Sequence, residues 1–246
     1  MNNSFTRPAY RDLITAFLER GYAIHGFATA KPKASHLILR HDIDFSPIDA
    51  LALAEIESDL SVGASYFFHS TSPFYNAVDP ETKEVCRALL DFGHEVGLHF
   101  DAAKFSNKLE ELDAQATKEC QILEDAIGVK VNVISFHRPA TSLLGLEAPI
   151  AGRIHAYQPK FFKHMGYCSD SSGVWRFGDP LSHNAVARQE GLQLLTHPIW
   201  WAHDDAGDRE RAITRFVERK PSSIKIAVKN VISGYDPTTG QIKDGR

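Results

Sequence analysis

Short apolar runs alternate with longer amphipathic segments along most of the chain. The runs have the length and the aliphatic and aromatic content of buried strands, and the longer segments repeat their apolar residues with the period of a helix. The predicted strands cover residues 36–40, 63–68, 95–98, 131–136, 166–169 and 192–196. The predicted helices cover residues 47–60, 80–92, 106–127 and 208–218. Parallel strands need a crossover between them, so we predict an α/β fold in which parallel strands form a barrel-like sheet.

The whole chain, residues 1–246, is predicted to form one such domain. No repeat, low-complexity tract or linker interrupts the alternation. A hydrophobic content of 43% and a charged content of 24% are typical of a globular protein with a substantial core. Residues 220–246, where Pro, Gly and Lys gather toward the end, are expected to form a peripheral C-terminal extension.

Charge and hydropathy argue against several classes of partner. A net charge of -4 gives no electrostatic reason to expect nucleic acid or an anionic membrane, so we expect a neutral or small polar substrate. The first residues lack the plan of a signal peptide, and no apolar run reaches the roughly 18 residues that span a bilayer. We therefore predict a cytoplasmic protein with no integral membrane segment, and the sequence leaves its oligomeric state open.

Acidic residues and histidines follow the predicted strands. In chain order they are Asp42, Asp44, His69, His99, His137, Asp170 and His197. The C-terminal ends of parallel strands lie on one face of a barrel, and that face carries the chemistry of such folds. The sequence therefore predicts a functional site on this face.

The two aspartates of the first strand, Asp42 and Asp44, favour a divalent cation. They are not needed to start the next helix, because Ser46 and Pro47 already supply an N-cap and a suitable first residue. Two carboxylates one residue apart repel each other unless a cation or a proton compensates them. A metal ion is the natural partner for such a pair.

The sequence allows two structural roles for Arg138 and for each of two tryptophans. Arg138, next to His137, can face the site if the chain turns at Pro139, or it can be an ordinary salt-bridge partner. Trp200 and Trp201 either pack under the rim of the barrel or line a site that stacks a ring such as a sugar.

Five short motifs resemble those of a known family. HDID, GHEVGLH, FHRP, SDSSGVW and LLTHP, in this order, are similar to the five motifs of the polysaccharide deacetylase superfamily, carbohydrate esterase family 4, in divergent form. The resemblance covers roughly residues 36–200. It implies a distorted (β/α) barrel that uses one divalent metal ion, most often zinc, to hydrolyse the N-acetyl amide of a sugar.

The resemblance implies a role for individual residues. Asp42 would be the general base, and Asp44 and His99 would bind the metal ion. His197 would be the general acid that protonates the leaving amine, since an amide nitrogen cannot leave as an anion. The nucleophile would be a water molecule on the metal ion.

Other motif residues would support the reaction. Arg138 and Asp170 are expected to pair and to tune the base. Trp175, which the resemblance places in the fourth motif, is expected to contact the substrate together with Trp200 and Trp201.

The sequence departs from the family pattern at one metal ligand. The family has a second histidine four residues after the first, and this chain has Ala103 there. Zinc in catalytic sites generally takes three protein ligands and water. His137 is expected to supply the third ligand, with His69 and Asp101 as alternatives.

The predicted function is a metal-dependent hydrolase that removes an acyl group, expected to be N-acetyl, from a sugar or glycan intermediate. One alternative is a catalytically inactive deacetylase-like barrel that binds a carbohydrate. Another is a metal hydrolase of a different C–N bond, such as that of a cyclic amide. Residues 140–165 are expected to form a lid or a wall of the substrate site.

Overall fold

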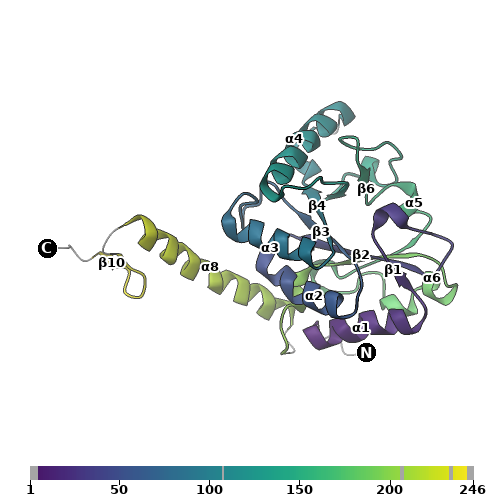
Figure 1. Ribbon diagram of the computed structural model, residues 1–246, viewed down its shortest axis with the longest axis horizontal. Helices are drawn as coiled ribbons and strands as arrows, with labels where there is room; N and C mark the ends of the chain where they lie inside the picture. The colour runs from purple at the N-terminus through teal and green to yellow at the C-terminus, as the bar shows by residue number, and fades with distance from the viewer. Residues whose placement is uncertain (1–4, 107, 206–207, 233–234, 243–246) are drawn as a thin grey trace. The chain divides into compact units, whose positions relative to one another are not determined.

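The computed structural model describes residues 5–106, 108–205, 208–232 and 235–242. The contacts divide the chain into two compact units, Met1–Ala206 and Gly207–Arg246. The first unit holds the main sheet and the helices around it (Figure 1).

A sheet of parallel strands forms the centre of the first unit. Its strand order is β6-β5-β4-β3-β2-β8-β7, with β1 paired to the start of β2, and every neighbouring pair is parallel. The strands are β1 (Ala23–Ile24), β2 (His36–Ile43), β3 (Ser65–Phe68), β4 (Glu95–Phe100), β5 (Val133–Phe136), β6 (Ile154–His155), β7 (Gly166–Ser169) and β8 (Leu192–Thr196). The predicted parallel α/β fold is confirmed. Strands β6 and β7 lie at the two ends of this order and do not pair with each other. The barrel formed by the described strands is therefore distorted and incomplete.

Side-chain contacts across the sheet demonstrate that it curls. Ser135 on β5 donates a hydrogen bond of 3.2 Å to Asp42 on β2, although β4 and β3 lie between these strands. In a flat sheet, strands three positions apart are separated by about 14 Å, which two such short side chains cannot bridge. The sheet therefore wraps around a shared interior.

Four long helices follow one another around the outside of the strands (Figure 1). They are α1 (Arg7–Glu19), α2 (Pro47–Asp59), α3 (Pro80–Asp91) and α4 (Leu109–Ile127). Proline at the first position starts α2 and α3, where a missing N–H costs nothing. Gly128, with φ of 76°, ends α4 in the left-handed conformation that glycine adopts without strain.

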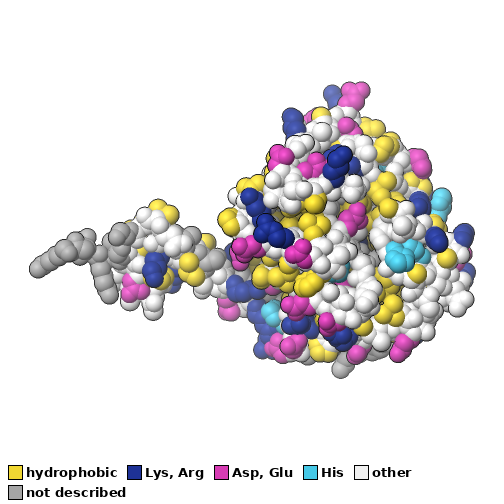
Figure 2. Space-filling view, viewed as in Figure 1, with side chains coloured by type: hydrophobic (Ala, Val, Ile, Leu, Met, Phe, Trp, Pro, Cys, Tyr) yellow, Lys and Arg dark blue, Asp and Glu magenta, His cyan; other side chains and the backbone are white. Residues whose placement is uncertain are grey.

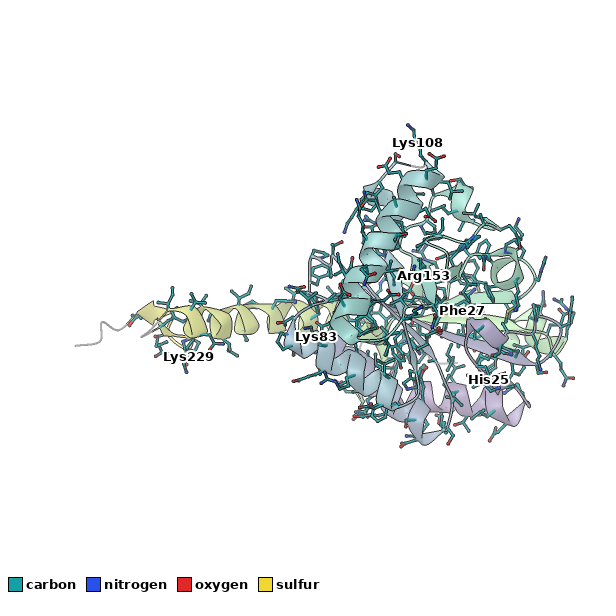
Figure 3. All side chains as sticks on the ribbon, turned by 45° about the horizontal axis from the view of Figure 1, so that its top comes forward. His25, Phe27, Lys83, Lys108, Arg153 and Lys229 are labelled. Carbon is teal, nitrogen blue, oxygen red and sulfur yellow. The ribbon has the colours of Figure 1, made fainter. Side chains whose placement is uncertain are left out.

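The segment after β5, predicted as a lid or a wall, contributes to the sheet itself. It contains the 3₁₀ turn η3 (Thr141–Leu143), the edge strand β6 and the short helix α5 (Pro159–Phe162). Arg153, labelled in Figure 3, donates 2.7 Å hydrogen bonds to Glu124 of α4 and to the carbonyl of Val131. The middle of the segment, directly before β6, is thereby fixed to the helix outside the sheet.

Short elements also lie around β8 in the C-terminal part of the first unit. The 3₁₀ turn η5 (Pro180–Ser182), α6 (Asn184–Ala187) and α7 (Pro198–Trp201) flank β8 in the sequence. No described helix has the length and apolar character that a membrane span requires.

Figure 2 shows acidic and basic side chains interspersed over the visible face of this unit rather than separated by sign.

Some predicted boundaries are wrong. Strand β2 continues to Ile43 and β4 to Phe100, so Asp42 and His99 lie within strands rather than after them. The last helix, α8 (Arg209–Val231), continues beyond residue 218 and through Pro221. The start of the predicted extension at residue 220 therefore falls inside a helix. The short hairpin of β9 (Tyr235–Asp236) and β10 (Gln241–Ile242) follows it.

A buried carboxylate joins the sheet to two helices. Glu57 of α2 is fully buried, accepts a hydrogen bond from the hydroxyl of Tyr10 of α1 and lies 2.7 Å from His41 Nε2 of β2. The hydroxyl of Tyr66 on β3 donates a third hydrogen bond, of 2.7 Å. Burial alone would raise the pKa of Glu57, but the attraction of His41 outweighs it, so the pKa lies below its usual value. The ionised carboxylate therefore holds four elements together.

Replacing Glu57 by Gln is expected to destabilise the fold by about 2–4 kcal/mol, because the buried donors lose their ionised acceptor. Urea unfolding of the metal-free protein measures the effect. Glu55→Gln is the matched control on the same helix, since Glu55 is exposed and its salt bridge to Arg7 should contribute less than about 1 kcal/mol.

The pH dependence of the same variants provides a second measurement. A carboxyl whose folded-state pKa is lowered contributes stability above its unfolded pKa of about 4.3, and this stability is lost as the pH falls through the folded value. The difference in unfolding free energy between wild type and Glu57→Gln should therefore shrink on acidification. A difference that stays constant to low pH would contradict this role.

Candidate metal and active site

The predicted polar residues meet at the C-terminal ends of the strands. Asp42 lies in β2 and Asp44 just after it, while His69, His137 and His197 follow β3, β5 and β8. His99 is within β4, and Asp170 follows β7. Parallel pairing brings these ends to one edge of the curled sheet.

Four side chains form a cluster that can hold a metal ion. Asp44, His69, His99 and His137 each offer one ligand atom, and these atoms all lie within 4.8 Å of one another. From Asp44 Oδ1 the distances are 3.0 Å to His99 Nε2, 3.4 Å to His137 Nδ1 and 3.7 Å to His69 Nε2. The geometry thus brings together the three predicted ligands and adds His69, which the sequence offers only as an alternative.

The donor atoms fit a divalent cation. Asp44 Oδ1 and His99 Nε2 are buried and have no hydrogen-bond partner among the described residues. With metal–ligand distances of about 2.0–2.1 Å, ligands at the corners of a tetrahedron lie about 3.4 Å apart, close to the observed separations. A set of imidazoles and one carboxylate suits zinc and related first-row ions.

The ionisation of the cluster also suits metal binding. Burial would raise the pKa of Asp44, but His137, His69 and His99 outweigh it and hold this pKa well below its ordinary value. Burial and the neighbouring His99 lower the pKa of His69 to about 4. The carboxylate is therefore ionised and His69 is neutral near pH 7, which is the state that metal ligands require.

Asp101, the other alternative ligand, lies outside this cluster. Its Oδ2 atom accepts a 2.6 Å hydrogen bond from Arg138 Nη2. It forms this salt bridge where the chain leaves β4. Of the two alternatives to His137, His69 is therefore the one that the geometry favours.

Arg40, which the sequence analysis overlooked, is the partner of Asp42. Its guanidinium donates two hydrogen bonds, from Nε to Asp42 Oδ1 at 3.0 Å and from Nη2 to Oδ2 at 2.7 Å. Burial would raise the pKa of Asp42, but the charge of Arg40 outweighs it and lowers this pKa to about 2. Alternate strand residues point to the same side, so the i, i+2 spacing of these two residues was the available signal.

The interior of the barrel is built to hold Arg40. This side chain is fully buried, and it donates hydrogen bonds of 3.2 Å to Gln193 Oε1 of β8 and 3.1 Å to the hydroxyl of Tyr157. Its guanidinium also lies 4.9 Å from the centre of the Tyr157 ring. Contacts from several elements therefore fix both Arg40 and the carboxylate that it holds.

The predicted pairing of Arg138 with Asp170 does not form. Arg138 bonds to Asp101, and Asp170 instead lies 2.6 Å from His197 Nδ1 through its Oδ1 atom. Asp170 Oδ2 accepts hydrogen bonds from Trp201 Nε1 at 2.7 Å and from the backbone N–H of His197 at 3.0 Å. The buried carboxylate is thus dedicated to orienting the histidine.

His197 is held in its protonated form. Burial lowers its pKa, but the charge of Asp170 and the hydrogen bond to it outweigh burial and raise the pKa to about 9. With Nδ1 directed at Asp170, Nε2 is left to face the cluster, 3.8 Å from Asp44 Oδ2. The side chain can therefore donate a proton at this point.

The tryptophans are more buried than a substrate-stacking role requires. Trp200 and Trp201 are only 8% and 3% exposed, so packing beneath the rim describes both of them. Trp201 donates its indole N–H to Asp170. The half-buried ring of Trp175 packs against the ring of Trp201, with the two centroids 5.9 Å apart. Trp175 is thus the most exposed of the three, although it is not among the described residues that line the cavity beside the cluster.

A cavity of about 270 Å³ opens beside the cluster. Asp44, His69 and His137 line it, together with Phe45 and Phe74. The two phenylalanine rings are stacked, with centroids 5.5 Å apart and an interplanar angle of 18°. An apolar wall next to convergent polar groups is typical of a small-molecule site.

Comparison with known proteins gives structural similarity at low sequence identity. No protein-family model and no curated protein sequence matches the chain. A family 4 carbohydrate esterase from Bacillus anthracis is 15% identical, with a TM-score of 0.45, over 86% of this chain and 84% of that one. A family 4 acetyl xylan esterase from Clostridium thermocellum, in complex with a cobalt ion, is 13% identical, with a TM-score of 0.39, over 66% of this chain and 73% of that one.

A third similar structure is a pseudoenzyme of the same family from Bacillus anthracis. It is 16% identical, with a TM-score of 0.43, and the match covers 77% of this chain. The matched part spans 63% of the pseudoenzyme, less than two thirds of its length.

Metal content of the purified protein tests the cluster directly. We expect close to one divalent ion per chain after purification without chelator, and loss of the ion in Asp44→Ala and His99→Ala. His69→Ala and His137→Ala should each weaken zinc affinity roughly tenfold or more, since even outer partners of metal ligands change affinity by 10–100-fold. His164→Ala, at an exposed histidine, is the control. A wild-type protein that takes up no ion from excess zinc would refute the metal site.

Proposed function

We propose that the protein is a metal-dependent hydrolase that removes an N-acyl group, in the first place N-acetyl, from a sugar or glycan intermediate. One observation carries the proposal: an ionised aspartate and a protonated histidine both face a cluster of metal-binding side chains. Asp42 Oδ2 lies 3.6 Å from His99 Nε2, and His197 Nε2 lies 3.8 Å from Asp44 Oδ2. The motif resemblance to carbohydrate esterases supports the same reaction.

A divalent ion held by Asp44, His99, His137 and His69 would polarise the acyl carbonyl and make bound water more acidic. We propose zinc, because the donor set of nitrogens and one oxygen is one that zinc commonly takes.

The chain's own residues would handle the protons. Asp42 would accept the proton of the attacking water, and Arg40 keeps its carboxylate ionised and in place. A carboxylate with a pKa of about 2 is a weak base, so the transfer depends on a water of raised acidity. His197 would then protonate the departing amine from Nε2, with Asp170 holding its ring.

A second candidate, an inactive barrel that binds a carbohydrate, has one observation in its favour. Four protein donors gather in the cluster, and four donors would complete a tetrahedral zinc site with no position for water. The ionised Asp42 and protonated His197 favour the hydrolase, because a pure binding protein has no need of a base and an acid. The cyclic-amide reaction would use the same groups and is distinguished by the choice of substrate.

Acetate release from N-acetylated sugars tests the proposal. Asp42→Asn and His197→Gln should each lower kcat by about 10²–10⁴-fold, as expected for loss of a general base or acid, while zinc content stays near that of wild type. His164→Gln serves as the control, and thermal unfolding verifies that Asp42→Asn, which removes the carboxylate charge beside the buried Arg40, remains folded. A wild-type protein that binds zinc and acetylated sugars but releases no acetate would support the binding-protein alternative.

The pH profile tests the assignment of the acid. His197 must be protonated to act, so kcat/KM should fall as the pH rises through the pKa of this group. Asp170→Asn removes the charge that raises this pKa and should move the fall to lower pH, in addition to lowering kcat. An alkaline limb at the same pH in wild type and variant would exclude His197 as the group that titrates.

A further inference from the structure

Two basic side chains border the cavity beside the metal cluster. Arg138 follows β5, and Lys104 ends the 3₁₀ turn η2 (Ala102–Lys104) after β4. Asp101 lies between them, with its Oδ2 atom 2.6 Å from Arg138 Nη2 and 4.0 Å from Lys104 Nζ. One carboxylate shared by two cations leaves a positive charge in excess.

Other acidic groups do not remove this excess. Within the described lining of the cavity, Asp44 and Asp101 are the acidic residues, and Asp44 belongs to the metal cluster. The carboxyl of Glu119 also interacts electrostatically with Lys104, but it is buried, hydrogen-bonded by Ser70 and absent from the lining, and burial raises its pKa. A bound divalent ion would add further positive charge to the same cavity.

Both cations are held in position and remain accessible. Lys104 Nζ donates hydrogen bonds of 3.0 Å and 3.2 Å to the carbonyl and hydroxyl of Thr71. Arg138 has φ of 49°, a conformation that side-chain-bearing residues rarely adopt and that is concentrated at functional sites. Its side chain is 65% exposed, and its guanidinium makes no hydrogen bond to described residues other than that to Asp101. Several N–H groups are therefore available to a ligand.

From this arrangement we infer that the sugar substrate carries an anionic group, a carboxylate or a phosphate, which Arg138 and Lys104 bind while the acylamino group lies at the metal cluster. The planar guanidinium fork matches both kinds of oxyanion, and the ammonium adds a second charge. The stacked rings of Phe45 and Phe74 supply an apolar wall for the sugar between these two ends. The inference rests on the proposed hydrolase function and adds the charge of its substrate.

The test compares one acetylated hexosamine in three forms: the neutral sugar, its uronic acid and its sugar phosphate. We expect kcat/KM of the zinc-loaded protein to be about tenfold or more higher for at least one anionic form, as charge-assisted hydrogen bonds to an oxyanion predict. The form that is preferred identifies the anion as carboxylate or phosphate.

Variants assign the preference to the two cations. Arg138→Gln and Lys104→Gln should each reduce the ratio of anionic to neutral kcat/KM several-fold, mainly through KM, and Arg138→Lys should retain part of it. Arg188→Gln is the matched control, because Arg188 is also an exposed arginine in a salt bridge, at 2.8 Å from Glu190, and does not line this cavity. Equal kcat/KM for all three forms, or a preference that survives in both Gln variants, would overturn the inference.

The experiment distinguishes a failure of the proposed hydrolase function from a failure of the anion site. No acetate release from any of the three forms would count against the hydrolase and leave the anion site to be judged by binding. Calorimetric titration of the zinc-loaded protein with the uronic acid, the sugar phosphate and the neutral sugar then decides it. Tighter binding of either anionic form that is lost in Arg138→Gln but kept in Arg188→Gln supports the site, and equal binding of all three sugars refutes it.

Discussion

Burying Asp42 inside a curled sheet, with Asp44 largely buried at the edge of the same sheet, costs free energy unless neighbouring cations or donors compensate their charges. Arg40 compensates Asp42, and because Arg40 is itself fully buried it needs acceptors of its own. Gln193 of β8 and Tyr157, which follows β6, supply them. One ion pair, Arg40–Asp42, therefore underlies three features of the structure. These are the polar interior of the barrel, the closeness of strands that are not neighbours and the ionised state of the proposed base.

The order of the strands decides which residues compensate Asp44. Its neighbours are histidines from β3, β4 and β5, which follow β2 in the sheet. Ala103, where the family resemblance leads one to expect a ligand, lies in the 3₁₀ turn after β4. Because β3 and β5 flank β4 on both sides, His69 and His137 can take over the missing contact. Position in the sheet, rather than distance along the sequence, thus determines the ligand set.

Local periodicity was enough to predict most strands, the long helices after them and the edge where the polar residues meet. It failed where the decisive contacts are long-range. In the sequence Arg40 only ends an apolar run. Its role as the partner of Asp42 could not be predicted, because its other acceptors come from β8 and from the segment after β5. The sequence prediction ends helix α8 at residue 218. Ile224, Val228 and Val231 nevertheless continue the three- and four-residue spacing of its apolar side chains beyond Pro221. For Trp201 the sequence allows either packing or sugar stacking, and the long-range hydrogen bond from its N–H to Asp170 favours packing.

The two groups proposed for proton transfer are held in opposite states by separate partners. Arg40 lowers the pKa of Asp42 to about 2, and Asp170 raises that of His197 to about 9, although both side chains are buried beside the same cluster. Burial by itself would drive each group toward its neutral form, so the charged partners reverse the effect of burial in both cases. At neutral pH this leaves a proton acceptor and a proton donor facing Asp44 and His99 at the same time. Separation of two pKa values by environment is how one site can perform acid and base chemistry together, and here Arg40 and Asp170 make the largest contributions against burial.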